Sequence, residues 1–324
     1  MLPAPLLRHF GRPAALFFHG VEKRIADPRV QSIQHDFSAF SEIADQLARD
    51  FEVLPLSLLG EVLKCPQRHR RCVFLMADDG YVNNLTEADA ILRVHNLPWT
   101  LFVSTRHIDT GTRNPLLLAR LFFLFAPAGR YGLENLGKVD ISARREADGI
   151  ESRLRALKHL DAERAQASIE SMRTQFPALD EHAARFASEA FLNWNQLREL
   201  KLHGVEIGAH ADSHWPMHDG QSPDYLREQA KRSRAAIEER IGPCRYFAYP
   251  FGNIGDVGRE AWRAVRDAGF DYAFTTLSGS LDAGCNPWLL PRYGLRPREP
   301  NLACVVPALR LGNPRLRGFQ RALA

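Results

Sequence analysis

The sequence predicts an α/β protein, a (β/α) barrel of about seven strands with a helical insertion. Three observations indicate this fold. Short apolar runs alternate with segments of helical periodicity, which is typical of parallel βα units. About seven such steps can be counted, more than an open sheet needs. Between residues 115 and 190 the alternation stops, and the chain there is rich in Arg, Ala, Glu and Leu.

The first part of the barrel is predicted over residues 1–111. Strands are expected over 14–21, 51–55, 72–77 and 99–104, and helices over 37–50, 56–63 and 85–95. The run 72–77 is continuously apolar, as in a buried strand. The segment 37–50 has apolar residues at helical spacing, and Asp36 or Ser38 can cap it.

The insertion is predicted over residues 112–190 and is expected to be helical throughout. Its stretch 116–125 is apolar nearly all round, so this helix should be buried. We expect it to pack the insertion against the barrel. A surface that faces a membrane or a partner is the alternative.

The second part of the barrel is predicted over residues 191–300, followed by a basic C-terminal tail over 301–324. Strands are expected over 205–209, 246–249, 270–276 and 289–295, and helices over 195–202, 225–241 and 257–268. Gly204, Gly242 and Gly269 follow the helices and should end them.

Composition excludes several classes of protein. The net charge of +4, from 42 basic and 38 acidic residues, is too small to predict a nucleic-acid partner. Five scattered cysteines with no CxxC pair argue against a disulfide framework and against a thiolate zinc site. The first twelve residues lack the apolar core of a signal peptide, and no apolar run is long enough to span a bilayer. We therefore expect a cytoplasmic protein.

Two acidic residues, Asp78 and Asp79, follow the apolar run 72–77, and a glycine comes next. Neighbouring carboxylates repel each other unless a cation or a proton separates them. A metal ion is the natural partner for such a pair at the end of a strand. The alternative is an ordinary turn, since turns favour Asp and Gly.

A second cluster follows the strand predicted over 205–209, where His210 and His214 are four residues apart. Two histidines at this spacing are by themselves weak evidence for a metal site, because surface histidines are common. Together with Asp79, the two imidazoles form a two-histidine, one-carboxylate set that leaves positions open for water and substrate. Such a metal lowers the pKa of its water, Asp78 serves as general base, and a backbone N–H after Pro250 stabilises an oxyanion. Together these groups predict metal-assisted hydrolysis of an amide or ester.

The same residues carry a family resemblance. MADDG (76–80), HADSH (210–214) and FAYPFG (247–252) resemble three motifs of polysaccharide deacetylases with the NodB-homology domain, a group like carbohydrate esterase family 4. LFFHGV (16–21) resembles the start of many bacterial members. The resemblance covers about 14–110 and 191–295. It implies a distorted (β/α) barrel, a divalent metal, and removal of an acyl group from an N-acylated amino sugar. Zn²⁺ is the metal we expect, with Co²⁺, Ni²⁺ and Mn²⁺ as alternatives.

Carried over by position, the resemblance makes Asp78 the base and Asp79, His210 and His214 the metal ligands. It also makes Phe251 the donor of the oxyanion N–H. Pro250 and Tyr249 are placed at the substrate groove. Trp215, which follows the second histidine, is expected to stack on a sugar, although most tryptophans pack in cores.

The sequence departs from the family pattern at two places. Ala248 stands where many members have an arginine that steadies the base, and Arg292 stands where a histidine often supplies the general acid. Arg292 can take over the steadying role but is a poor proton donor. His19 and His107 are therefore the candidates for the general acid, against the alternative that each is a structural histidine.

The predicted function is N-deacetylation of an amino sugar in a cytoplasmic glycan precursor or surface-polysaccharide intermediate, lipid-linked or nucleotide-linked. The apolar stretch 116–125 and the basic tail (Arg310, Arg315, Arg317, Arg321) are expected to provide peripheral contact with the inner face of the membrane. Two alternatives stay open: a hydrolase of a non-sugar amide such as a formamide or ureide, and a decayed barrel that binds glycan or a partner.

Overall fold

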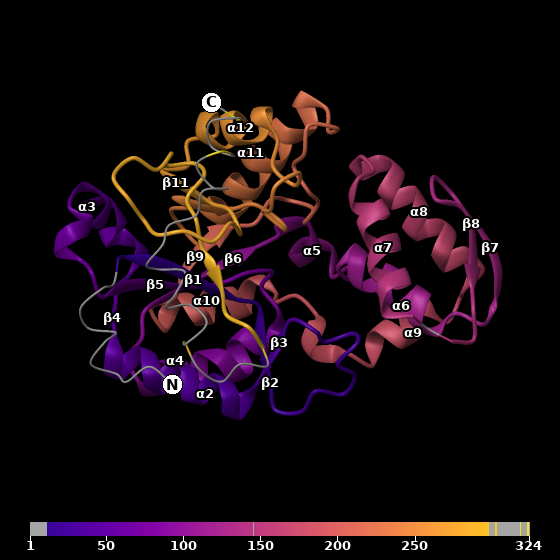
Figure 1. Ribbon diagram of the computed structural model, residues 1–324, viewed down its shortest axis with the longest axis horizontal. Coiled ribbons are helices and arrows are strands. Elements are labelled where there is room, and N and C mark those ends of the chain that lie inside the picture. The colour runs from indigo at the N-terminus through magenta and orange to yellow at the C-terminus, as the bar shows by residue number, and fades with distance from the viewer. Residues whose placement is uncertain (1–11, 145, 298–301, 303–317, 319–322, 324) are drawn as a thin grey trace.

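The computed structural model describes residues 12–144, 146–297, 302, 318 and 323. It contains a barrel and a smaller lobe formed by the insertion, which lies on the right-hand side of Figure 1. The chain enters and leaves this lobe between two strands of the barrel, β6 (Trp99–Val103) and β9 (Glu206–Ala209), which pair with each other. The lobe is therefore an insertion into a continuous sheet.

The main sheet is parallel, and seven of its strands follow one another in the order β11-β10-β9-β6-β5-β1-β12. The strands not yet given are β1 (Ala14–Phe18), β5 (Cys72–Ala77), β10 (Tyr246–Ala248), β11 (Tyr272–Phe274) and β12 (Tyr293–Gly294). An eighth strand, β4 (Glu52–Val53), pairs with the start of β5. The predicted barrel of about seven strands is confirmed.

The last strand closes the barrel in two pieces. Leu290 pairs with Phe274 at the end of β11, whereas β12 pairs with β1. Between the two pieces the chain turns inward at Arg292, whose backbone N–H donates to the Leu277 carbonyl. The strand predicted over 289–295 is thus interrupted, and Arg292 lies at the interruption.

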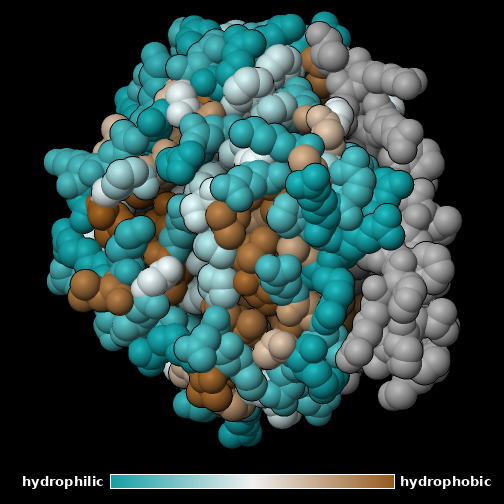
Figure 2. Space-filling view, turned by 90° about the vertical axis from the view of Figure 1, so that its left-hand side faces the viewer, coloured by the Kyte–Doolittle hydropathy of each residue, from teal (hydrophilic) through white to brown (hydrophobic). Residues whose placement is uncertain are grey.

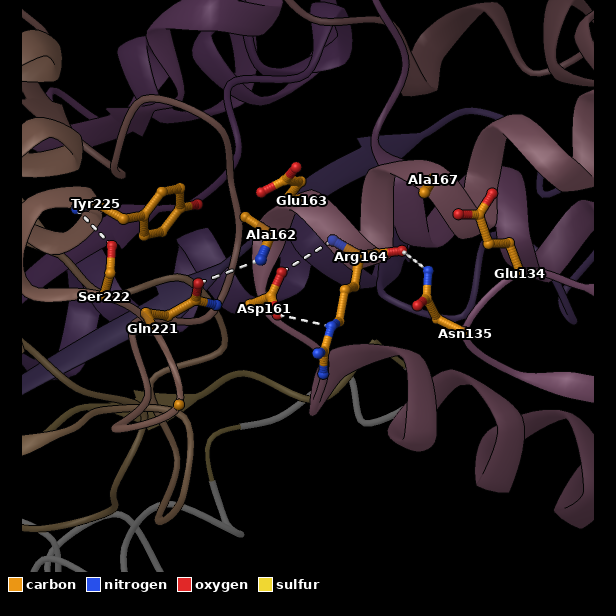
Figure 3. A pocket seen from close by; sticks show the side chains of 11 residues that line it. Glu134, Asn135, Asp161, Ala162, Glu163, Arg164, Ala167, Gln221, Ser222 and Tyr225 are labelled. Atoms are coloured by element: carbon orange, nitrogen blue, oxygen red, sulfur yellow. Dashed lines mark hydrogen bonds and ion pairs between the residues drawn. The ribbon is translucent and has the colours of Figure 1, made fainter.

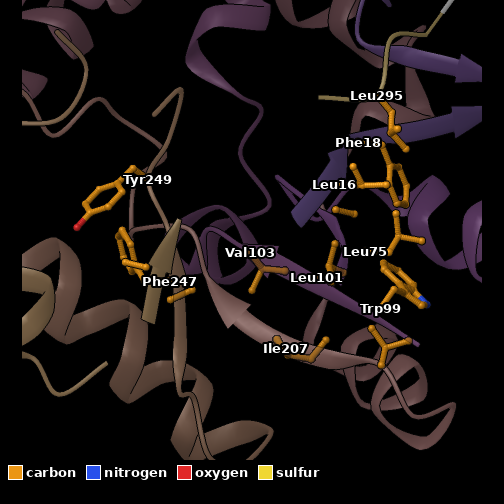
Figure 4. Packing of buried hydrophobic residues seen from close by; sticks show 14 of the residues in the cluster. Leu16, Phe18, Leu75, Trp99, Leu101, Val103, Ile207, Phe247, Tyr249 and Leu295 are labelled. Carbon is orange, nitrogen blue, oxygen red and sulfur yellow. The ribbon is translucent and has the colours of Figure 1, made fainter. Parts of the chain in front are cut away.

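Alternate residues of the strands enter two separate cores, as period-2 geometry requires. Phe17, Phe74, Met76 and Phe102 belong to the core that fills the barrel. The residues at the alternate strand positions, which include Trp99 and Phe247, pack outward against the helices (Figure 4). The helices in this outer core are α2 (Phe37–Asp50), α4 (Asp89–Val94), α10 (Trp194–Leu202), α11 (Pro223–Arg240) and α12 (Arg259–Asp267).

The predicted helix over 37–50 is confirmed as α2, and Asp36 caps it by accepting from the backbone N–H groups of Ser38 and Ala39. The strand predicted over 14–21 is divided at His19. After β1 the chain forms β2 (Gly20–Glu22), which pairs with β3 (Gln34–Asp36) in a separate small sheet. The break frees His19 from both ladders.

The remaining elements between β4 and β6 are short. They comprise η1 (Leu56–Leu58), α3 (Leu59–Lys64), η2 (Pro66–Arg68) and a π-helical turn, η3 (Asn84–Ala88), that leads into α4. The helices predicted over 56–63 and 85–95 are confirmed by η1 with α3 and by η3 with α4. After β6, α5 (Thr105–Thr110) leads toward the insertion.

The insertion is not helical throughout, so that prediction is wrong. Its helices are α6 (Pro115–Phe125), α7 (Ala147–Lys158), α8 (Ala162–Gln175), α9 (Leu179–Ala184) and a short 3₁₀ turn, η4 (Ala187–Glu189). Between α6 and α7 lies an antiparallel hairpin, β7 (Gly129–Leu133) and β8 (Gly137–Ile141). Its turn uses Asn135 and Gly137 at positive φ, the left-handed conformation that Asn and Gly adopt most readily.

The apolar helix α6 forms the centre of the insertion's own core. Leu117 to Leu124, apart from Arg120, is buried among side chains of α7, α8, α9 and the hairpin. The expected buried helix is confirmed, and these side chains are not available to a membrane. No helix in the described residues is long and apolar enough to cross a bilayer. The arginines of the predicted basic tail lie outside the described residues.

Hydrophobic side chains on the barrel face of Figure 2 show in separate patches between hydrophilic ones. Among the described residues, the large apolar side chains that are strongly exposed are Val94, Leu202 and Ile254. They lie on α4, on α10 and in the loop after β10.

Candidate active site

The carboxyl ends of the parallel strands bring the predicted chemistry together. Asp78 and Asp79 follow β5, His210 follows β9, and His19 follows β1. The backbone N–H of Asp78 still donates to the Phe18 carbonyl, and that of His210 to the Val103 carbonyl. Asp78 and His210 are therefore held by the last hydrogen bonds of the barrel sheet, which makes their positions rigid.

Asp79, His210 and His214 converge on one buried point. One carboxylate oxygen of Asp79, Oδ1, lies 2.7 Å from His214 Nε2 and 3.4 Å from His210 Nε2. All three side chains are buried, and their ligand atoms lie within 4.8 Å of one another. Asp79 and His214 both have positive φ, which is strained for residues with a side chain. The backbone is bent to bring these groups into one site.

The hydrogen bonds around His210 show that a metal fits this site. Its Nδ1 lies 2.7 Å from the Ala248 carbonyl, which can only accept a hydrogen bond. Nδ1 is therefore assigned a proton, and Nε2 is the ring nitrogen that faces the carboxylate of Asp79. Nε2, opposite a carboxylate and within reach of His214, is the atom that would ligate a metal. Donation of the second ring nitrogen to a backbone carbonyl is the usual arrangement around a metal-binding histidine.

Asp78 has a different partner. Arg292 Nη1 and Nη2 donate to its two oxygens at 2.7 and 2.8 Å, and Arg292 Nε donates to the Thr275 carbonyl. Both side chains are buried. Burial opposes ionisation of Asp78, but the guanidinium outweighs it and holds the pKa of the carboxyl below its usual value. Arg292 thus has the contacts that the predicted steadying role requires.

The two candidate acids of the sequence lie in different surroundings. His107 is buried, stacks on Phe191, and places both ring nitrogens near oxygens of Thr112 and Ser213. It is a structural histidine. His19 is partly buried and lines the same cavity as Asp78, and its ring makes no hydrogen bond among the described residues. Burial lowers the pKa of His19.

The turn after β10 presents a backbone donor to the cavity. Phe251 has a φ of 62°, and its carbonyl accepts from Thr276 Oγ1 at 2.6 Å. Among the described residues its own N–H has no partner. The Phe251 ring lies edge-on to His214 and under the ammonium of Lys158, at 4.2 Å from the ring centroid. Pro250, buried just before it, begins the turn.

Tyr249 and Trp215 do not reach the cavity. Tyr249 is buried in the outer core, and its hydroxyl donates to the Trp288 carbonyl. Trp215 is 3% exposed, packs in the insertion's core and donates from its indole N–H to the Leu160 carbonyl. Neither ring has a free face for a sugar, because the structure uses both to fill cores. Both side chains lie outside the expected substrate groove.

The cavity has a volume of about 410 Å³ and is lined by both lobes. The barrel supplies the acids and histidines, and the insertion supplies Asn114, Arg120, Lys158 and Glu189. These four residues were not among those predicted from the sequence. Their only signal was the position of Asn114 and Glu189 next to the predicted boundaries of the insertion.

Charged groups from the insertion are held in ion pairs at the rim. Arg120 pairs with Glu151, and Lys158 bridges to Asp256 of the barrel at 2.9 Å.

Glu189 is 3% exposed, and burial raises its pKa to about 8. Its Oε1 has no hydrogen-bond partner among the described residues.

A second cavity, of about 550 Å³, lies between the insertion and the start of α11 (Figure 3). Several of its polar groups are engaged by backbone N–H groups: Asp161 accepts from the Arg164 N–H, Gln221 from the Ala162 N–H, and Ser222 from the Tyr225 N–H.

Comparisons with known proteins agree on one group. A family model described as polysaccharide deacetylase matches residues 66–273, more than half of the chain. A solved deacetylase of Streptococcus pyogenes, PplD, "in complex with acetate", superposes with a TM-score of 0.58 at 15% identity, covering 90% of this chain and 96% of that one. None of the curated proteins compared with the chain matches it in sequence.

Two further structures are similar. A de-N-acetylase from Aggregatibacter actinomycetemcomitans has a TM-score of 0.56 at 15% identity, covering 92% of this chain and 99% of that one. IcaB from Ammonifex degensii has a TM-score of 0.55 at 17% identity, covering 91% and 97%. At these identities the likeness establishes the fold.

Proposed function

The chain belongs to the polysaccharide deacetylase family, and from that premise we propose that it is a metal-dependent hydrolase that removes an N-acyl group, N-acetyl above all, from an amino sugar. The observation that carries the proposal is the separation of two neighbouring carboxylates into two environments. Asp78 faces a buried guanidinium, and Asp79 faces two imidazoles. One acid is thus prepared as a base and the other as a ligand.

The proposed reaction begins with water held beside Asp78, which takes one of its protons as the water oxygen attacks the acyl carbon. Arg292 keeps Asp78 ionised and fixes the plane of its carboxylate. Phe251 offers its free backbone N–H to the developing oxyanion. The C–N bond then breaks, and the amine leaves with a proton from a general acid. The products are the acid and the free amino sugar.

Asp79, His210 and His214 are the residues that would hold the metal. A divalent cation there supplies a Lewis acid that makes water a better nucleophile at neutral pH and polarises the acyl oxygen. The donor set of two nitrogens and one oxygen suits Zn²⁺ and also Co²⁺, Ni²⁺ or Mn²⁺. Metal supply decides among them as much as affinity does.

The substrate and its location are further parts of the proposal. We propose an N-acylated sugar in a glycan precursor or surface-polysaccharide intermediate, lipid-linked or nucleotide-linked, and an enzyme in the cytoplasm at the inner face of the membrane. Because α6 is buried in the insertion, any membrane contact has to come from elsewhere on the chain. Cell fractionation and acetate release from each class of precursor test both points.

Metal content and acetate release, measured on the same preparations, test the function. We expect about one metal ion per chain in the wild type, and loss of metal and of acetate release from N-acetylated sugars in His210→Ala. In His203→Ala, where a partly buried histidine beside Asp89 is removed, both should remain. Asp78→Asn should keep the metal and lose activity.

The two open alternatives give other results in this experiment. Activity on formamides or ureides without activity on sugars would move the assignment to a non-sugar amidohydrolase. A wild type that stays free of metal and inactive after divalent metal is added would favour a binding protein.

A further inference from the structure

Hydrolysis of an amide needs a proton donor for the leaving nitrogen, because an amine anion is too basic to leave unaided. The position where the family often has a histidine for this task is occupied here by Arg292, which is engaged with Asp78. His107 is engaged by Thr112 and Ser213. His19 lines the cavity, but burial lowers its pKa and so favours the form that has lost its proton. A donor that faces the cavity and keeps its proton is still required.

Glu189 is placed to fill this need. It ends η4, the last turn of the insertion, and lines the same cavity as Asp78, His210 and His214. The strand-like segment after it is fixed to the loop that carries the acids. Leu192 N–H donates to the Gly80 carbonyl and Val82 N–H to the Ala190 carbonyl, both at 2.8 Å, and the Tyr81 and Phe191 rings stack.

The surroundings of Glu189 favour its neutral form. Burial is the main cause, and the carboxylates of Asp79 (after β5) and Glu22 (β2) act in the same direction. Gln34 (β3) and Arg113, just before α6, favour the charged form but are outweighed. The pKa of about 8 leaves Glu189 protonated at neutral pH, and its carboxyl group lines the cavity that also holds Asp78. A buried carboxyl group that keeps its proton and faces a cavity can donate that proton to a leaving group.

Resting on the proposed function, we propose that Glu189 is the general acid of the deacetylation, supplied by the insertion in place of the family's histidine. Its carboxyl O–H donates to the amide nitrogen as the C–N bond breaks, and its electron pair stays on the carboxylate. Asp78 has meanwhile taken one proton from water. After the products leave, that proton returns through solvent to Glu189, so atoms and charge balance over the cycle.

Leaving groups of different basicity test this role. The test compares acetate release from an N-acetylated amino-sugar oligosaccharide with acetate release from an aryl acetate, whose phenolate leaves without a proton. We expect Glu189→Gln to lose about 10²–10⁴-fold in kcat on the amide and to change less than about threefold on the ester. Asp78→Asn should lose both reactions. Glu206→Gln, a partly buried glutamate at the other end of β9, should keep both.

Four results overturn the assignment. Full amide activity in Glu189→Gln excludes Glu189 as the acid, and so does an equal loss on amide and ester in a variant that has wild-type metal content and circular dichroism. Selective amide loss in His19→Asn, but not in Glu189→Gln, makes His19 the donor. A wild type that cleaves the ester but no N-acetylated sugar removes the proposed function itself and, with it, this role.

Discussion

Arg292 and Asp78, 214 residues apart in the chain, form a bidentate ion pair in the barrel with N–O distances of 2.7 and 2.8 Å. The guanidinium also lies over the Phe17 ring, at 4.4 Å from its centroid. The pair joins the end of β5 to the two-piece strand that closes the barrel. Arg292, the residue proposed to steady the base, thus also connects the first and last parts of the fold.

Replacement of Arg292 should damage catalysis and stability together. Arg292→Met leaves the buried Asp78 without a partner, so we expect the free energy of unfolding to fall by about 3–5 kcal/mol. Arg292→Lys keeps the charge but not the two-pronged geometry. The pKa of Asp78 should rise, so the acidic limb of kcat/KM should move to higher pH. Urea unfolding and a pH–rate profile measure the two effects.

The sign of this shift follows from linkage. The folded-state pKa of Asp78 is depressed, so its contribution to stability is present above the unfolded pKa and disappears as the pH falls through the folded one. Arg245→Met, which breaks an exposed pair with Asp271, is the control and should cost less than about 1 kcal/mol. An acidic limb unchanged in Arg292→Lys would contradict the role of Arg292.

Addition of zinc should stabilise the wild type against heat. A ligand that binds only the folded state adds about 2.7 kcal/mol at 100 times its Kd. The rise in melting temperature should be absent in His214→Asn and retained in His203→Asn, since His203 bonds Asp89 outside the site. Equal stabilisation of all three proteins would place the ion elsewhere.

Lys158 should act through the turn that carries the oxyanion donor. Its ammonium pairs with Asp256 at 2.9 Å and lies over the Phe251 ring. Because the Phe251 N–H serves the transition state, Lys158→Met should lower kcat by about tenfold with little change in KM. Lys158→Arg should recover most of the loss, and Lys138→Met on the exposed edge of the hairpin should have no effect. A rise in KM at constant kcat would instead make Lys158 a substrate contact.

The sequence was sufficient for the barrel because its elements are defined locally. The continuous apolar run at 72–77 and the spacing of α2 are signals that no distant contact has to supply. The hairpin of the insertion was missed, since its strands are short and lie between long stretches of helix formers. The break at Arg292 also depends on a distant contact, the ion pair with Asp78.

The candidate site also contains residues whose positions follow from local sequence and residues whose positions depend on distant contacts. The pairing of Asp79 with two histidines was predictable because each lies directly after a strand, and the ends of parallel strands meet. Glu189 was not predictable, because its position depends on how the insertion folds back beside residues 80–82. Trp215 was predicted at the substrate groove because it follows His214 in the sequence. His214 faces the cavity, whereas the indole of Trp215 packs in the insertion's core.

The insertion's core should account for much of its stability. Phe122 is fully buried on α6, so Phe122→Ala should cost about 3–5 kcal/mol in urea unfolding. Leu202→Ala, at a side chain that is 87% exposed, should stay within about 0.5 kcal/mol of the wild type. A similar small effect for Phe122→Ala would mean that α6 is not packed in water and would revive the alternative that it faces a membrane.

The neutral state of Glu189 has a consequence that needs no substrate. Its folded-state pKa, about 8, is raised above the ordinary value of 4.5, so the folded protein binds the extra proton. The stability from this group is complete below the unfolded pKa and is lost as the pH rises through about 8. Urea unfolding at intervals between pH 5 and 9 should therefore show a decline for the wild type that Glu189→Gln reduces. A decline of the same size in both proteins would mean that Glu189 is already ionised at neutral pH, and a carboxylate that has lost its proton cannot protonate the leaving amine.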